Sequence, residues 1–280
     1  MTNLTRRDFI GAATAGAAAL LAKPAALLGA ARKKIPIGVQ LYSVRTVFPG
    51  DVAGTLAGIK KIGYDAVEFA GYANKDAKTL RQLLDDNGLK CCGTHIGLQT
   101  LTGDALPKTV EFNQTLGNKN LVVPGGLPGT RNIEGWAKNA ETFSEIAEKL
   151  KPHHMRVGYH NHSAEFKAID GEIPEDVFFG KASQDVFLQL DIGHCVHGGA
   201  DPVAYMKKFP GRVLSVHVKE YSPTKRDALI GEGEIKWPQV LEACETVAGT
   251  EWYIIEEESG AYKGLEGIER SYQSLRKLLV

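Results

Sequence analysis

Short apolar runs rich in β-branched residues recur along the chain from Ile35 onward, and each leads through polar residues into an amphipathic stretch. Because these runs are continuously apolar rather than alternating, they are typical of strands buried on both faces, as in a parallel sheet. The eight runs cover 35–43, 66–71, 91–97, 121–126, 155–162, 186–194, 213–220 and 252–259. The pattern therefore predicts eight strands separated by helices.

The stretches between the runs predict helices, several of which begin at residues that favour a helix start, such as Asp51, Asn132 and Asp201. These helices cover 51–61, 76–87, 134–151, 202–208, 238–247 and 265–279, with less regular patterns at 103–117 and 172–184. Eight β–α units in about 250 residues fit a single (β/α)8 TIM barrel. A doubly wound α/β sheet is the alternative, but it usually has a glycine-rich loop after its first strand, and VQLYSVR is not one.

The first 31 residues have a different pattern. Arg6 and Arg7 precede an Ala/Leu-rich run over 9–22, and small residues follow near position 30. This layout is typical of a secretory signal peptide, with a disordered or helical tail as the alternative, and it is too short for a membrane span. The arginine pair with the following Asp-Phe-Ile resembles a twin-arginine export signal, which implies a periplasmic or otherwise exported protein without stable membrane insertion. The barrel domain would then cover 32–280.

Composition narrows the classes of partner. The chain has 33 basic and 33 acidic residues, and this zero net charge argues against a surface that binds nucleic acid through its phosphates. Cys91 and Cys92 are adjacent, Cys195 and Cys244 stand alone, and no CxxC motif is present. The cysteines are therefore expected to be buried thiols rather than a disulfide framework or a zinc site.

Polar side chains gather where the predicted strands end, which is where TIM barrels carry their chemistry. Six of the eight histidines lie at or just beyond a strand end. The polar residues at these ends are Gln40, Tyr42, Ser43, Arg45, Glu68, His95, His160, Asn161, His162, Glu165, Asp191, His194, His197, His217, Lys219, Glu256, Glu257 and Glu258.

Taken singly, each of these residues has a structural explanation. Asp191 could cap a helix, His217 could be a satisfied core histidine, and the three glutamates from Glu256 could be an exposed charged run. Taken together, they converge on one barrel mouth, where buried carboxylates need protons or a cation. A divalent metal ion is the simplest compensation, and the mixed oxygen and imidazole set suits manganese, zinc or cobalt better than calcium.

The ordered segments IGVQLYSVR, EFAGY, LDIGHCVHGGADP, VHVKE, LIGEGEIKW and YIIEEES resemble the sugar phosphate isomerase/epimerase superfamily of xylose isomerase-like TIM barrels. The resemblance implies one divalent metal, held at the ends of strands five to eight by Glu, Asp, His and Glu. Carried over, these ligands include Asp191, His217 and Glu256. Strand five has His160 where the family usually has glutamate, so the fourth ligand is either His160 or Glu165.

The segment YHNHSAEF resembles a subgroup tied to inositol-type or 3-keto-sugar chemistry. The resemblance thus implies a metal-dependent isomerase, epimerase or lyase/hydratase that acts on a sugar or 3-keto-sugar through an enediolate-type intermediate. The candidate catalytic residues are His160, His162, Glu165, His194, Lys219 and Glu256. The strand-five residues and Glu256 would move protons, Lys219 would stabilise an oxyanion and His194 would orient a hydroxyl group. Export favours an unphosphorylated substrate, and an oligomer is compatible with the sequence.

Two other functional classes share features with this sequence. A metal-dependent apurinic-site endonuclease shares this barrel, but it needs further metal ligands and a basic surface. A non-catalytic carbohydrate-binding protein would rely on an aromatic platform, whereas Trp136, Trp237 and Trp252 fall within or beside predicted helices and strands. The sequence therefore favours the enzyme.

Overall fold

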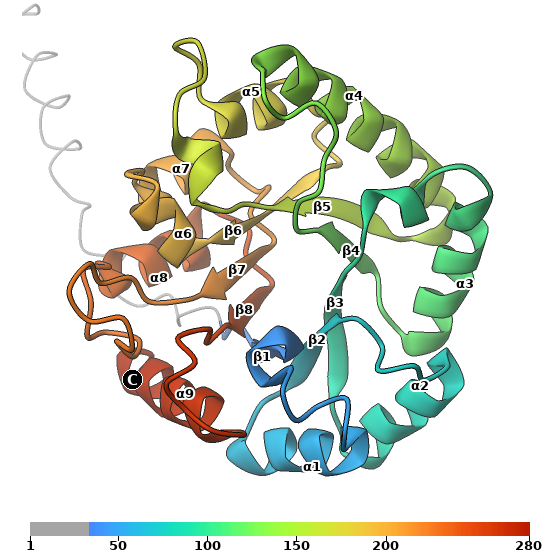
Figure 1. Cartoon of the computed structure of the whole chain (residues 1–280), viewed down its shortest axis with the longest axis vertical. Helices are drawn as coiled ribbons and strands as arrows, with labels where there is room; N and C mark the ends of the chain where they lie inside the picture. The colour runs from blue at the N-terminus through green and yellow to red at the C-terminus, as the bar shows by residue number, and fades with distance from the viewer. Residues whose placement is uncertain (1–33) are drawn as a thin grey trace, which may run out of the picture. The chain divides into compact units, whose positions relative to one another are not determined.

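The computed structural model describes residues 34–280, which form a closed barrel of eight parallel strands surrounded by helices (Figure 1). The strands are β1 (Ile37–Gln40), β2 (Ala66–Ala70), β3 (Lys90–His95), β4 (Asn120–Val123), β5 (Arg156–His160), β6 (Phe187–Asp191), β7 (Ser215–Val218) and β8 (Trp252–Ile255). Each strand pairs with the next, and β8 pairs with β1. The predicted (β/α)8 barrel is confirmed. The predicted export signal lies outside the described residues.

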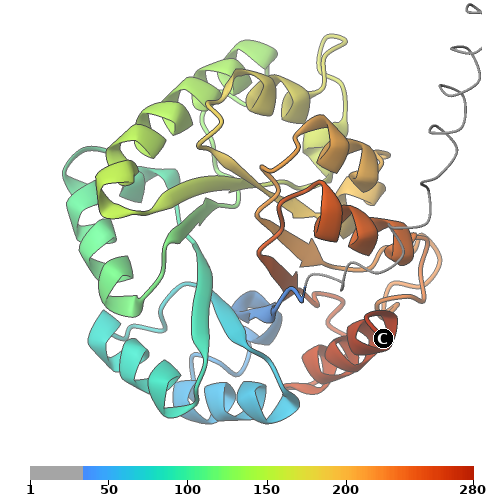
Figure 2. The same cartoon turned by 180° about the vertical axis from the view of Figure 1, so that it is seen from behind.

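Helices cover the outside of the barrel, and the view from behind shows the same ring around the strands (Figure 2). They are α1 (Val52–Ile62), α2 (Ala77–Asp86), α3 (Leu106–Leu116), α4 (Ile133–Leu150), α5 (Pro174–Lys181), α6 (Ile192–His197), α7 (Pro202–Lys208), α8 (Trp237–Thr246) and α9 (Glu266–Leu278). The six regular helix predictions agree with the structure to within one residue at each end. The less regular patterns correspond to α3 and α5, which are shorter than the ranges predicted for them.

All eight predicted runs extend beyond the carboxyl ends of the observed strands, and at β6 and β1 a side-chain hydrogen bond turns the chain there. β6 ends at Asp191 and α6 begins at the next residue, because the Asp191 carboxylate caps that helix by accepting a hydrogen bond from the backbone N–H of His194 at 2.7 Å. At the end of β1 the Gln40 side chain accepts a hydrogen bond from the N–H of Tyr42 at 3.0 Å, and a 3-10 helix, η1 (Leu41–Val44), follows. The polar residues at the strand ends therefore turn the chain as well as face the mouth.

Alternation along the strands separates the two faces of the barrel wall. Leu188 and Leu190 of β6 join the main hydrophobic core, whereas Gln189 and Asp191 contact polar residues of other strands. On β5, a Cβ atom at Gly158 would lie 2.5 Å from the ring of Phe187, so a glycine is needed where this ring packs.

The amino-terminal end of the barrel has its own polar contacts. The guanidinium group of Arg156, at the start of β5, donates to both carboxylate oxygens of Glu251, just before β8, at 2.9 and 2.8 Å. All four cysteines are buried and free, as predicted. Among residues 34–280, no helix has the length and apolar character needed to cross a bilayer.

Candidate active site

Four buried side chains from the ends of consecutive strands meet at the carboxyl end of the barrel. His160 of β5, Asp191 of β6, His217 of β7 and Glu256, directly after β8, each place a potential ligand atom within 4.8 Å of the others. The strand register explains part of this, because Asp191 is paired directly with His217. The three ligands carried over by resemblance therefore come together, and His160 joins them, whereas Glu165 lies outside the group.

The two carboxylate oxygens of Asp191 have different environments. Oδ1 accepts the hydrogen bond that caps α6, while Oδ2 is buried without a hydrogen-bond partner. The nearest cationic groups, Nδ1 of His217 and Nζ of Lys219, are both 3.9 Å from Oδ2. Burial raises the pKa of Asp191, as it does for any carboxyl group removed from water. An unsatisfied buried carboxylate oxygen is costly, and a bound cation would satisfy it.

His217 lies between two carboxylates. Its Nε2 is 2.7 Å from Oε2 of Glu68, and its Nδ1 is 3.1 Å from Oε2 of Glu256. Burial by itself would lower the pKa of His217, but Glu256 and Glu68 outweigh it and raise the pKa to about 10. A histidine that ligates a metal commonly donates its other N–H to a carboxylate. With Nε2 directed at Glu68, Nδ1 of His217 is the nitrogen that faces Asp191 and Glu256.

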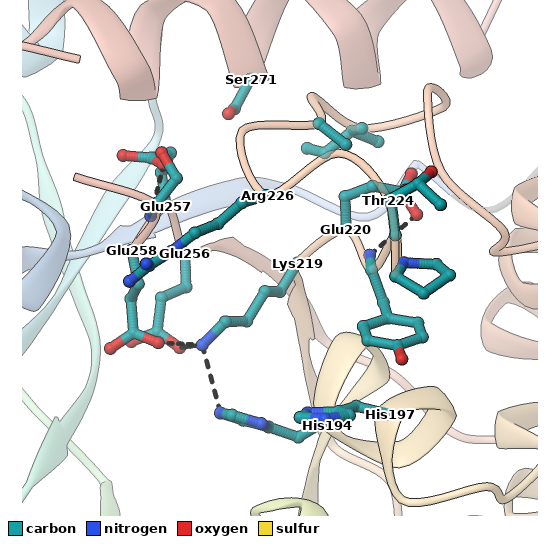
Figure 3. Close-up of a pocket in the computed structure, with 16 residues that line it drawn as sticks. His194, His197, Lys219, Glu220, Thr224, Arg226, Glu256, Glu257, Glu258 and Ser271 are labelled. Carbon is teal, nitrogen blue, oxygen red and sulfur yellow. Dashed lines mark hydrogen bonds and ion pairs between the residues drawn. The ribbon is translucent and has the colours of Figure 1, made fainter. Parts of the chain in front are cut away.

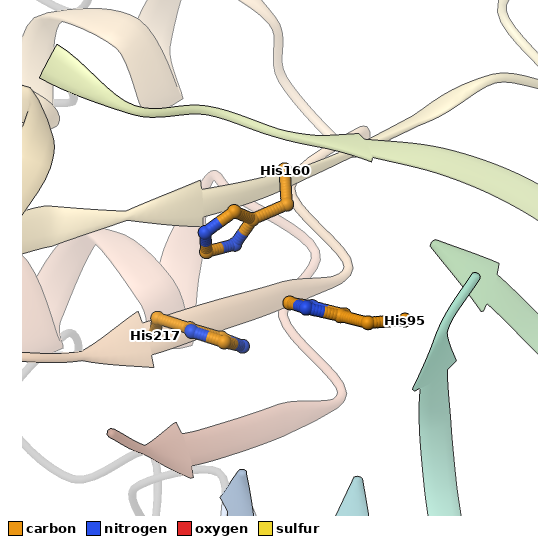
Figure 4. Close-up of side chains that lie close together, drawn as sticks. All are labelled: His95, His160 and His217. Carbon is orange, nitrogen blue, oxygen red and sulfur yellow. The ribbon is translucent and has the colours of Figure 1, made fainter. Parts of the chain in front are cut away.

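A second group of three imidazoles overlaps the first. His95, His160 and His217 come from β3, β5 and β7, and their rings converge inside the barrel (Figure 4). This group contains no carboxylate, and Nε2 of His95 is 2.7 Å from Oε1 of Gln189. The group with two carboxylates and the unsatisfied oxygen of Asp191 therefore fits a divalent cation better. Burial lowers the pKa of His160 well below its usual value, with further contributions from His217 and His95.

Glu165 takes a different place from the one proposed for a ligand. It lies in a 3-10 helix after β5, η5 (Ser163–Phe166), and its Oε1 accepts a hydrogen bond from the Tyr159 hydroxyl group at 2.7 Å. Its side chain lines a cavity of about 440 Å³ together with Trp136 and His162. His162 has an exposed side chain, and its Nδ1 is 4.0 Å from Oε1 of Glu165. Of the two residues left open by the sequence, His160 lies with Asp191, His217 and Glu256, and Glu165 does not.

Lys219 lies at the rim of the group. Its Nζ contacts the carboxylate of Glu258, Oε2 of Glu256 at 3.4 Å and Nε2 of His194 at 3.2 Å (Figure 3). Burial would lower the pKa of Lys219, but Asp191, Glu256 and Glu258 outweigh it and raise the pKa. Burial and then the charge of Lys219 lower the pKa of His194 to about 4. An ammonium group therefore lies beside a neutral imidazole.

Two cavities open on this cluster and share Glu256 and Glu258 in their walls. One, of about 470 Å³, is also lined by His95, His160 and His162. The other, of about 700 Å³, is lined by His194, His197, Lys219 and Arg226 among others, several of which are drawn in Figure 3. Cavities of this size, with convergent polar groups, are typical of sites for small polar molecules.

Sequence reasoning overlooked Gln189 and gave Glu68 and His95 no role beyond their places at strand ends. Gln189 is fully buried, and its side chain contacts Glu68, His95 and His160. The signal that could have found it is the two-residue period of β6, which puts Gln189 and Asp191 on the same face.

Comparisons with known proteins agree with the barrel fold. A family model for the xylose isomerase-like TIM barrel matches residues 56–278. An inosose dehydratase of Serratia proteamaculans (strain 568) is 24% identical over 195 residues, which cover 61% of this chain and 62% of the relative. The match thus spans about three fifths of that relative's length.

Solved structures show the same fold. A sugar phosphate isomerase/epimerase from Parabacteroides distasonis ATCC 8503 superposes with a TM-score of 0.74 at 25% identity, covering 91% of this chain and 98% of that one. The zinc-containing structure of the IOLI protein superposes with a TM-score of 0.69 at 13% identity, covering 88% of this chain and 98% of that one.

Proposed function

The chain belongs to the xylose isomerase-like TIM barrel family, and from this premise we propose that it is a divalent-metal-dependent enzyme that eliminates water from a keto-sugar or keto-cyclitol. The observation that carries the proposal is the buried group of His160, Asp191, His217 and Glu256, in which one oxygen of Asp191 has no partner. The inosose dehydratase relatives support the reaction class.

The four residues of this group would hold the metal ion, and their nitrogen and oxygen donors suit manganese, zinc or cobalt. A metal ion bound there would supply Lewis-acid polarisation of the substrate carbonyl group. The residues around it bind and orient the substrate. His95 and Tyr42 line the cavity of about 470 Å³ beside the four proposed ligands, where they can contact hydroxyl groups of a polyol.

Elimination beside a carbonyl group needs a base and a proton donor. We assign His162 as the base, because its side chain is exposed and lines the cavity next to His160. The proton would leave the carbon beside the carbonyl for this imidazole, and a carbon–carbon double bond would form as the neighbouring hydroxyl group departs. Lys219 would give that hydroxyl group a proton, so that it leaves as water. His194, hydrogen-bonded to Lys219, would orient the hydroxyl group.

Epimerisation or isomerisation is the second candidate, and the 25% identical sugar phosphate isomerase/epimerase supports it. It begins with the same proton removal but returns the proton to carbon instead of expelling water. The predicted export signal favours an unphosphorylated substrate in either case, and the balanced charge of the chain favours a small-molecule substrate over nucleic acid.

The experiment combines metal analysis with NMR. Purified protein, loaded with manganese, zinc or cobalt and freed of unbound metal, is incubated in deuterated buffer with inosose, 3-keto-glucosides and simple ketoses. We expect about one metal ion per chain and loss of water from a keto-substrate. Deuterium exchange without loss of water would instead identify an epimerase or isomerase. Binding of sugar with neither change would identify a carbohydrate-binding protein.

A further inference from the structure

A chain of buried hydrogen bonds runs from Gln40 through Glu68 and Gln189 to His95 and His160. The backbone N–H of Tyr42 can only donate a hydrogen bond, and it lies 3.0 Å from Oε1 of Gln40. This contact identifies the Gln40 oxygen, so its NH2 group points the other way and donates to Oε2 of Glu68 at 2.8 Å.

The carboxylate of Glu68 in turn fixes the orientation of the Gln189 side-chain amide. A carboxylate oxygen accepts hydrogen bonds, and the Gln40 NH2 group already donates to Glu68. Its Oε1 is 2.7 Å from Nε2 of Gln189, so this NH2 group is the donor, and it also contacts the Ser215 hydroxyl group at 3.0 Å. The oxygen of Gln189 therefore faces the histidines.

The histidines must then donate to that oxygen. Nδ1 of His160 is 3.1 Å and Nε2 of His95 is 2.7 Å from Oε1 of Gln189, so each of these nitrogens carries a proton. A neutral His160 with its proton on Nδ1 keeps a lone pair on Nε2, the nitrogen that is free to bind a metal ion. On β7, Glu68 accepts from Nε2 of His217 and leaves Nδ1 of that ring toward Asp191 and Glu256.

We propose that Glu68 and Gln189 are positioning residues: Gln189 selects the metal-binding tautomer of His160, and Glu68 orients the ring of His217 so that its Nδ1 faces Asp191 and Glu256. The inference rests on the proposed function, because it assigns these residues to the same metal group. Both side chains are fully buried, and a Cβ atom at position 93 would lie 2.4 Å from Oε1 of Glu68, so Gly93 makes room for the carboxylate. The convergence of His95, His160 and His217 is then explained by their hydrogen bonds to Gln189 and Glu68, and it requires no second metal ion.

The test replaces the acceptor while keeping the size of the side chain. Gln189→Met removes both the oxygen and the NH2 group, Gln189→Glu keeps acceptor oxygens toward His95 and His160, and Gln82→Met makes the same change at an exposed position of α2. Protein labelled with 15N-histidine is studied without metal by long-range 1H–15N NMR, which distinguishes the tautomers of His160. Affinity for zinc is measured by competition with a chelator, and folding is checked by circular dichroism.

We expect wild type and Gln189→Glu to show His160 protonated on Nδ1, and Gln189→Met to show a mixture of tautomers. Zinc affinity should fall by about 10- to 100-fold in Gln189→Met, as is typical when an outer partner of a ligand is lost, and stay unchanged in Gln82→Met. An unchanged tautomer in Gln189→Met would overturn the inference. If the wild type binds no divalent metal, the proposed function fails, while the tautomer comparison still decides the role of Gln189.

Discussion

Replacement of Asp191 by asparagine separates the two roles of this residue. The carboxamide oxygen can still cap α6, because asparagine is as good a cap as aspartate, so the fold should be kept. The unpartnered oxygen, Oδ2, is replaced by an NH2 group, which does not ligate a metal ion. Metal affinity should therefore fall by more than about 100-fold, since loss even of an outer-shell partner costs about 10- to 100-fold.

The same change should destabilise the protein even when no metal is bound. Burial raises the pKa of Asp191, but Lys219 and His217 lower it, and the new NH2 group would face these two cationic groups without an acceptor. An unsatisfied buried donor costs about 1–3 kcal/mol, and each kcal/mol corresponds to roughly 2–4 °C in Tm for a domain of this size. In the presence of chelator, Asp191→Asn should therefore melt at least about 2 °C below wild type.

Added metal should widen the difference in Tm between the variant and wild type. At a free metal concentration 100 times its Kd, the wild type gains about 2.7 kcal/mol, or roughly 5–10 °C, whereas Asp191→Asn gains almost nothing. The assay is differential scanning calorimetry with chelator and with manganese or zinc. Asp201→Asn is the matched control, because Asp201 caps α7 by accepting from the N–H of Val203 at 2.9 Å and is exposed. An equal metal-induced shift in Asp191→Asn and wild type would refute the assignment.

Three further predictions concern other parts of the molecule. Lys219→Met should keep the metal ion but reduce kcat by about 100-fold or more, because it removes the ammonium group beside Glu256 and His194. Metal analysis and turnover followed by NMR check this. A normal kcat would contradict the role of Lys219 in the reaction. Glu251→Gln should lose about 1 kcal/mol at pH 7, because the Arg156 guanidinium group holds the pKa of Glu251 below its usual value. Because the pKa of Glu251 is lower in the folded state, its carboxylate stabilises the fold above the pKa of the unfolded state, and this contribution is lost as the pH falls. Urea unfolding at pH 7 and pH 3 should therefore show the lower stability of Glu251→Gln only at pH 7. Replacement of Arg6 and Arg7 by lysine should abolish export, and cell fractionation with the unchanged chain as control decides this.

Much of the barrel could be predicted because its signals are local. Strand and helix periodicity, together with helix-start residues such as Asp51 and Asn132, placed six helices to within one residue. The short α6 was not predicted, because an apolar run followed by Asp191 reads as a continuing strand until the carboxylate is seen to cap the next turn.

The sequence by itself determined that eight strands alternate with helices, and that acidic and imidazole side chains follow strands five to eight. Chain order and the rule that parallel strands present their carboxyl ends together are sufficient for this. Only the tertiary structure decided that His160 rather than Glu165 lies with Asp191, because that depends on the path of the chain after β5. It also decided that Glu68 and Gln189, 121 residues apart, share a hydrogen bond. Barrel closure brings β2 and β6 together across the interior, and no local pattern encodes that distance.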